Sequence, residues 1–183
     1  MRKLSVKSVV AIGIGAALFF VLGRFVAIPS PVPNVTISIQ YGLLAFVATL
    51  FGPVVGLLVG LIGHFFIDLS AGWGVWWSWV ITSGICGLLI GLGTKGVNLN
   101  DGKFGKSDIL RFIITVVLTH LVCWALVAPV LDIIIYAEPA NKVFVQGLVS
   151  AAANIVTTVI VGGILCFAYA KAKPGKGSLK KEK

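Results

Sequence analysis

Long apolar runs separated by short polar stretches make up the hydrophobic pattern of this chain. No Asp, Glu, Lys or Arg occurs within residues 25–67, 69–94, 112–131 or 143–170. Because a helix needs about 20 mostly apolar residues to cross a membrane, such runs predict membrane-spanning helices. We expect six spans, at residues 8–28, 40–51, 53–70, 76–93, 109–135 and 143–170. The second is short, and is either tilted or re-entrant. The pattern predicts an all-α integral membrane protein.

Small residues mark one side of the third predicted span, at Gly52, Gly56, Gly60 and Gly63. Small residues about four apart allow the backbone of a neighbouring helix to approach closely in lipid. The same side of the helix then carries His64 and Asp68, and a group of tryptophans follows at Trp73, Trp76, Trp77 and Trp79. We interpret this stretch as a tightly packed helix that delivers polar groups to an aromatic-rich site near one membrane face.

Composition and charge agree with a membrane protein and predict its orientation. Hydrophobic residues make up 58% of the chain, charged residues only 11%, and the net charge is +9. The basic residues cluster before the first span, around the 94–108 loop and in the tail 171–183, whereas the opposite loops carry only Lys142. The positive-inside rule therefore places both termini and the 94–108 loop in the cytoplasm. We expect a membrane domain over residues 1–170 and a basic cytoplasmic tail that contacts anionic lipid of the bilayer rather than nucleic acid.

Polar stripes on the last two spans predict a cavity. The fifth span carries His120, Trp124 and Asp132 on a side that drifts slowly round the helix. The sixth carries Gln146, Ser150, Asn154 and Thr157 on a comparable side. Amides facing lipid would be costly, so these groups are expected to face inward. A purely structural hydrogen-bond network is the alternative interpretation.

A stiff outer loop follows the first span. It contains three prolines in five residues and ends near the polar side chains of Asn34, Gln40 and Tyr41. Proline restricts the backbone, so the loop suits a pre-shaped lid as well as a plain connection. Arg24 lies just before it and either extends to the membrane interface or turns into a polar cavity.

Several candidate groups have more than one interpretation. His64 and Asp68 suit ligand contact, a structural pair, or metal or proton chemistry, and the tryptophans suit either ligand contact or a membrane-interface belt. The chain has no phosphate loop, HExxH or GxSxG motif, and its cysteines have no metal-site spacing. We therefore expect no enzyme activity, no cofactor and no resident metal. A rival function is a stand-alone metal or proton transporter that uses His64, Asp68, His120 and Asp132.

Five segments of the sequence resemble a known family: AIGIGAALFFVLGRF, IPSPVPN, ISIQYG, LFGPVVGLLVGLIGH and WWSWVITSGICGLLIGL. They are similar to the substrate-binding S components of energy-coupling factor (ECF) transporters, and look most like the cobalamin-associated branch. The resemblance covers about residues 4–170. It implies a six-helix bundle with both termini inside, which captures a vitamin at the outer face. It also implies two kinds of partner, a transmembrane coupling subunit and two cytoplasmic ATPases. Riboflavin or a thiamine precursor is the alternative ligand.

The resemblance also implies site residues. Binding in the family uses outer loops and the outer halves of the later helices, which correspond here to Asn34, Gln40, Tyr41, Trp73, Trp76, Trp77, Asp132, Gln146 and Asn154. The polar positions within the spans add Arg24, His64, Asp68, His120 and Trp124 as candidate substrate contacts. Family members dock on their partner through an A-x-x-x-A pattern in the first helix. The corresponding small residues here are Ala11, Gly13, Gly15 and Ala17, which also suit packing within the chain.

Overall fold

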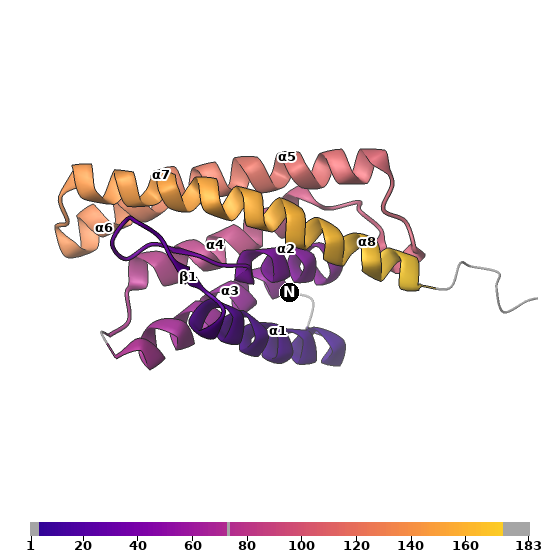
Figure 1. Ribbon diagram of the computed structural model, residues 1–183. Coiled ribbons are helices and arrows are strands. Elements are labelled where there is room, and N and C mark those ends of the chain that lie inside the picture. The colour runs from indigo at the N-terminus through magenta and orange to yellow at the C-terminus, as the bar shows by residue number, and fades with distance from the viewer. Residues whose placement is uncertain (1–3, 73, 174–183) are drawn as a thin grey trace, which may run out of the picture.

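The computed structural model describes residues 4–72 and 74–173, which form a helical bundle with one short hairpin (Figure 1). The first half contains α1 (Val6–Phe25), β1 (Ile28–Pro29), β2 (Thr36–Ile37), α2 (Gln40–Phe51), α3 (Pro53–Ala71) and α4 (Trp77–Gly93). The second half contains the 3-10 turn η1 (Leu99–Asp101), α5 (Lys106–Val122), η2 (Cys123–Val127), α6 (Ala128–Tyr136), α7 (Ala140–Thr157), η3 (Thr158–Gly162) and α8 (Gly163–Ala172).

Two long helices dominate the second half of the chain. One runs without a break over Lys106–Tyr136 and the other over Ala140–Ala172. Each contains a π-turn, η2 in the first and η3 in the second, where the backbone takes one wider turn. Pro129 lies two residues after η2, in the interior of the first of these helices, where its missing backbone N–H removes one helical hydrogen bond. The wider turn lets the helix continue past this proline.

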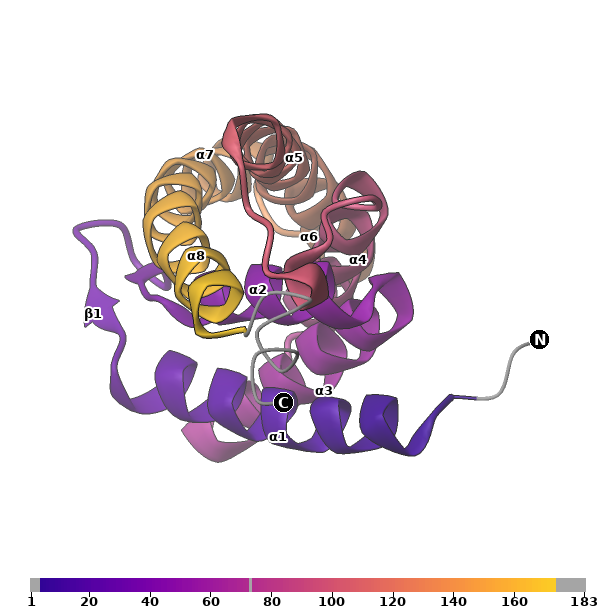
Figure 2. The same ribbon diagram turned by 90° about the vertical axis from the view of Figure 1, so that its right-hand side faces the viewer.

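The short helix α2 lies at the centre of the bundle. Viewed end-on, α4, α5, α7 and α8 curve round one side of it, while α1 and α3 lie on the other (Figure 2). Its side chains are correspondingly buried over most of its length, including Leu44, Ala45 and Ala48. An apolar helix that is surrounded by other helices forms the core of the bundle.

Among the described residues, four helices are long and apolar enough to cross a membrane: Val6–Phe25, Pro53–Ala71, Lys106–Tyr136 and Ala140–Ala172. The other two predicted spans correspond to α2, with 12 residues, and α4, with 17. At a rise of about 1.5 Å per residue, α2 covers only about 18 Å of a hydrocarbon core about 30 Å thick. The helical class is therefore observed, whereas six crossings and cytoplasmic termini remain predictions.

The glycines of α3 bring two helices into backbone contact, as the sequence predicts. A Cβ atom at Gly56 would overlap the backbone oxygen of Gly87 on α4, and one at Gly60 would overlap that of Ser83. Gly63 packs in the same way against Phe19 of α1, 2.6 Å from a hypothetical Cβ atom. Small side chains therefore hold α3 close to α4 on one side and to α1 on the other.

The α3–α4 contact predicts a large effect of a single added methyl group. Gly87→Ala should lower the free energy of unfolding by about 1–3 kcal/mol, because the methyl group would overlap the Gly56 carbonyl and force the helices apart. Gly163→Ala is the matched control, since a Cβ atom there meets nothing within 4 Å. Thermal unfolding of the two variants in the same detergent measures the difference. Equal melting temperatures would contradict the proposed tight contact.

Candidate functional site

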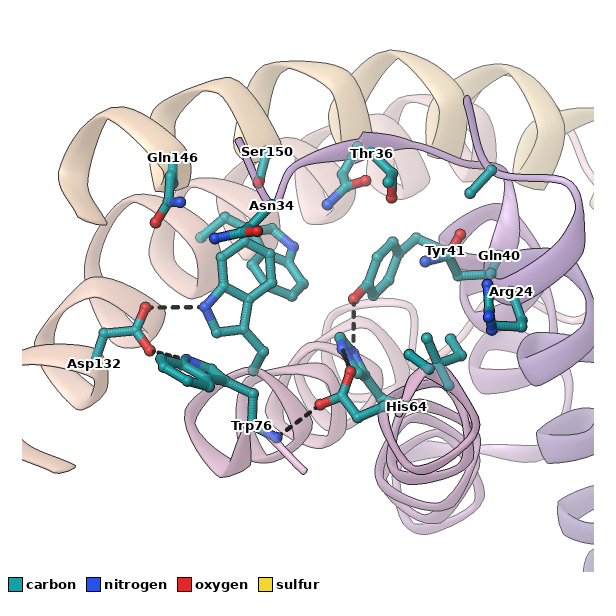
Figure 3. A pocket seen from close by; sticks show the side chains of 18 of the residues that line it. Arg24, Asn34, Thr36, Gln40, Tyr41, His64, Trp76, Asp132, Gln146 and Ser150 are labelled. Carbon is teal, nitrogen blue, oxygen red and sulfur yellow. Dashed lines mark hydrogen bonds and ion pairs between the residues drawn. The ribbon is translucent and has the colours of Figure 1, made fainter. Parts of the chain in front are cut away.

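A cavity of about 520 Å³ lies between the hairpin and the bundle (Figure 3). The end of α1, the hairpin, α2, α3, the start of α4, η2, α6 and α7 all contribute to its wall. Its volume is within the range of small-molecule sites, about 300–1,000 Å³. Aromatic rings and uncharged polar groups both line it, including Tyr41, Trp76, Trp79, Asn34 and Gln146.

A buried carboxylate on α6 holds one end of the cavity together. Asp132 accepts hydrogen bonds from the indole Nε1 atoms of Trp76, at 2.7 Å, and Trp79, at 2.9 Å. The Ser78 hydroxyl donates a third hydrogen bond to the same carboxylate. Only 2% of Asp132 is exposed, so these donors replace the water that the charge would otherwise require. The carboxylate thus fixes the start of α4 against α6 and sets the direction of two indole rings.

A second polar chain runs from α2 through α4 to α3. The Tyr41 hydroxyl lies 2.8 Å from Ser83 Oγ, which lies 2.5 Å from His64 Nδ1. His64 Nε2 is 3.7 Å from Asp68 Oδ1, and Asp68 Oδ2 accepts a 2.9 Å hydrogen bond from the backbone N–H of Trp76. The chain therefore ties the cavity wall on three helices to the connection before α4.

The hairpin covers the cavity and is attached to α7. Its strands pair antiparallel through Ile28 with Ile37 and Pro29 with Thr36. Asn34, in the turn between them, has a φ of 63°, a left-handed conformation that Asn adopts more readily than most residues. Gln146 Nε2 donates a 2.8 Å hydrogen bond to the backbone oxygen of Pro33. This bond connects the turn of the hairpin directly to the cavity wall.

Most of the side chains predicted as substrate contacts come together here. The structure places around the cavity Arg24, Asn34, Gln40, Tyr41, His64, Asp68, Trp76, Trp124, Asp132, Gln146 and Asn154. Arg24 thus lies on the cavity side, next to Gln40 in Figure 3. Their binding role stays a prediction, because proximity to a cavity does not by itself show contact with a ligand.

Two predicted contacts lie elsewhere, and one falls outside the described residues. Trp77 is 49% exposed, and its ring packs against Phe65 on the outer side of α3. His120 is wholly buried behind the cavity wall. Trp77 departs because adjacent helical positions point in different directions around the axis, whereas His120 lies on the same side as Trp124 but one turn further along the helix. Trp73 lies outside the part of the chain that the structure describes.

Other lining residues were not among the predicted contacts. They include Thr36, Ser150 and the ion pair of Glu138 with Lys142, whose charged atoms are 2.6 Å apart. Trp79, which the sequence left as either a ligand contact or part of a membrane-interface belt, also lines the cavity. Ser150 lies midway between Gln146 and Asn154 at four-residue spacing, so the polar stripe on the sixth span signalled it. Sequence offered no comparable signal for the ion pair, because i,i+4 charge pairs are common on exposed helix ends.

Two buried polar atoms of the cavity wall have no hydrogen-bond partner within the part of the chain that the structure describes. They are Oε1 of Gln40, a residue that is 7% exposed, and Oγ of Ser150, a residue that is 3% exposed. An unsatisfied buried polar group costs about 1–3 kcal/mol, so such atoms are rare unless something else satisfies them. They lie on opposite sides of the cavity in Figure 3, on α2 and α7. Neither atom is accessible from the cavity in this conformation, so a ligand would satisfy them only after the side chain rotates.

The residues of the rival metal or proton transporter fall into three separate places. His64 and Asp68 belong to the polar chain of hydrogen bonds on α3. Asp132, on α6, accepts hydrogen bonds from indoles at the start of α4, and His120 bonds to Trp124 and Thr158. Within residues 4–72 and 74–173, no group of three or more His, Cys, Asp or Glu side chains is arranged to hold a metal ion. Nothing in the geometry specifically favours this rival.

The small residues of α1 divide between two faces. Gly15 is buried, with a hypothetical Cβ atom 2.9 Å from Val59, and Ala11 packs partly against the core. These two residues therefore serve packing within the chain. Gly13 and Ala17 are exposed, and a Cβ atom at Gly13 meets nothing within 4 Å. The open face of the helix is the one that carries the Gly13–Ala17 spacing.

The model of the family described as "ECF-type riboflavin transporter, S component" matches residues 3–171. UPF0397 proteins from Staphylococcus aureus strains MSSA476 and Newman are each 51% identical over 182 residues, covering 99% of this chain and 98% of theirs.

Two solved structures share the fold. One is FolT bound with folic acid, with a TM-score of 0.65 and 14% identity, covering 87% of this chain and 95% of that one. The other is the S component for biotin from an ECF-type ABC transporter, with a TM-score of 0.67 and 16% identity, covering 93% of each chain. At these identities the likeness concerns the fold alone.

The carboxylate of Asp132 yields a prediction about the cavity end. Asp132→Ala should lower the free energy of unfolding by about 2–4 kcal/mol, because it leaves three donors without an acceptor in a buried place. It should also shift tryptophan emission to longer wavelength as Trp76 and Trp79 are released. Glu138→Gln is the matched control, since its exposed ion pair contributes at most about 1 kcal/mol. Unchanged stability and emission in Asp132→Ala would show that the carboxylate does not hold the indoles.

Proposed function

Because this chain belongs to the ECF-type riboflavin transporter S component family, we propose that its cavity captures a flat, conjugated vitamin from outside the cell. An S component is a substrate-binding subunit of a transporter in the membrane, and is not an enzyme. The proposal assigns substrate binding to the cavity beneath the hairpin and the energy for transport to partner chains.

The observation that supports this most strongly is the character of the cavity wall. Rings of Tyr41, Trp76 and Trp79 offer a large aromatic area, and aromatic faces suit flat conjugated ligands. Gln40 and Ser150 each hold a buried polar atom without a partner among the described residues, and a rotation of the side chain would turn it toward the cavity. A cavity with apolar surface and a few placed polar groups is the usual design of a small-molecule site.

Riboflavin is the first substrate to test. Its fused ring system is flat and conjugated, it carries hydrogen-bonding groups on both the ring and the side chain, and the matched family is named for it. Cobalamin, the ligand inferred from the sequence, is much larger, and neither the matched family nor the two structural neighbours described above is named for it. A thiamine precursor, folate and biotin complete the set of competing vitamins, the last two being named with the structural neighbours.

The proposed topology has six crossings with both termini in the cytoplasm. The distribution of basic residues supports it, and α2 would complete its crossing together with the adjoining loops. The domain proposed for residues 1–170 ends within α8, and the tail 171–183 begins there. Only Lys171 and Lys173 of the tail lysines lie within the described residues. The tail is proposed to contact anionic lipid, with no nucleic-acid partner.

The proposed protein partners are a transmembrane coupling subunit and two cytoplasmic ATPases. S components work with an ECF module, and the chain has no phosphate loop of its own. The open face of α1 at Gly13 and Ala17 is proposed as the docking face, because small residues there permit close helix contact.

Titration of the purified protein with vitamins tests the proposed function. Riboflavin should quench tryptophan emission and bind more tightly than cobalamin, thiamine, folic acid or biotin. Ser150→Ala should weaken binding by about tenfold, because it removes a buried hydroxyl that the ligand is proposed to satisfy. Ser70→Ala, whose hydroxyl bonds to the Ile67 oxygen at an exposed helix end, is the matched control. Tight binding of another vitamin would retain the mechanism and change the substrate, and no binding of any would reject the proposal.

Docking yields a separate prediction. Ala17→Phe should reduce co-purification with a co-expressed ECF module at least tenfold while leaving the affinity for the bound vitamin unchanged, because the ring would block close helix contact. Leu148→Phe is the control, since Leu148 is 57% exposed on α7, away from α1. Equal recovery of the module with both variants would exclude this face of α1 as the docking surface.

A further inference from the structure

A buried histidine behind the cavity connects the two π-turns. His120, the last polar residue of α5, contacts Trp124 in η2 and Thr158 in η3, and all three are wholly buried. Trp124 Nε1 donates a 3.0 Å hydrogen bond to His120 Nδ1. An indole N–H can only donate, so Nδ1 is the acceptor and the ring proton of the neutral imidazole is on Nε2. That proton is then donated to Thr158 Oγ1, also at 3.0 Å.

Trp124 is one of the residues that line the cavity, and its ring, which we call the floor, lies between two other aromatic rings. Its ring centroid lies 5.3 Å from that of Tyr41 and 5.2 Å from that of Trp79. The His120 ring meets Tyr41 edge to face as well, with centroids 5.6 Å apart. The position of the floor therefore depends on the hydrogen bond that His120 accepts from Trp124.

The second π-turn returns to the same part of the wall. A Cβ atom at Gly162 in η3 would lie 3.1 Å from the backbone oxygen of Gly42, and one at Gly42 would lie 3.1 Å from the Gly162 nitrogen. Gly42 directly follows Tyr41 on α2. A closed circuit of contacts thus runs from Tyr41 through Trp124, His120 and η3 back to α2.

We propose that His120 is a positioning residue, which fixes the Trp124 floor of the cavity by anchoring it to the π-turn η3 of the last helix. The imidazole does this with both ring nitrogens, one as acceptor and one as donor, so the two π-turns keep a single relative position. This assignment rests on the proposed function only where it relates the floor to ligand binding. A displacement at η3 is transmitted to the cavity although η3 itself forms no part of the lining.

Thr158→Val provides the test, because it removes one hydroxyl and keeps the size of the side chain. The variant is compared with the wild-type protein in lipid nanodiscs without added ligand, by the indole N–H resonances of nitrogen-15-labelled tryptophan. Amide hydrogen exchange is followed in both π-turns. Trp124→Phe identifies the resonance of Trp124.

The Trp124 resonance should shift in Thr158→Val, and exchange should speed up about fivefold at residues 123–127 as well as at 158–162. Thr157→Val is the matched control, since the Thr157 hydroxyl bonds to the Ala153 oxygen within its own helix. It should leave the Trp124 resonance unchanged. A Trp124 resonance that is unmoved by Thr158→Val, with faster exchange confined to 158–162, would overturn the proposal and leave His120 as a simple core residue.

A binding measurement then separates this inference from the proposed function. With riboflavin as the probe, Thr158→Val should weaken binding about fivefold and Thr157→Val should not. If riboflavin fails to bind the wild-type protein, the proposed substrate is wrong, while the resonance and exchange results still decide the role of His120.

Discussion

A polar group inside a bundle of apolar helices must find its partners within the protein, and this requirement organises the site. Lipid cannot hydrogen-bond to the carboxylate of Asp132, so three donors from the start of α4 converge on it. Their convergence brings two indoles to one end of the cavity and holds the connection before α4 against α6. The aromatic character of the site and its polar support are therefore parts of one arrangement.

Close packing of the helices makes this arrangement possible. Gly56 and Gly60 let α3 approach α4 at the level of the backbone, which brings Ser83 within reach of His64 and Tyr41. A larger residue at either glycine would move the Ser83 hydroxyl away from the Tyr41 hydroxyl and the His64 imidazole. The polar chain thus depends on the stripe of small residues, which shares α3 with His64 but not with Tyr41 or Ser83.

Helical periodicity explains how much of the site could be predicted. Spacing of three and four residues places side chains on one helix face, so Gln146 and Asn154 could be expected to face inward, with Ser150 between them. The same reasoning predicted that a neighbouring helix approaches α3 closely, but not that this helix is α4. It could not distinguish Trp76 from Trp77, because the helix begins between them and its rotation is decided by packing. It also could not predict that His120 bonds to Thr158, because that residue is 38 positions away in the sequence and lies on another helix.

The π-turns have a geometric consequence for the order of residues along each long helix. In an uninterrupted α-helix, successive residues advance by about 100°, so the 12 positions from His120 to Asp132 would rotate the side chain by about 120° from its starting direction. A π-turn accommodates one additional residue, which cancels about 100° of that rotation. His120 and Asp132 consequently share one azimuth. By the same phase correction, Cys166 beyond η3 returns to the buried side that carries Thr158. Deleting one residue from η2 would turn the C-terminal part of its helix by about a quarter of a revolution and direct the Asp132 carboxylate away from the indoles of Trp76 and Trp79.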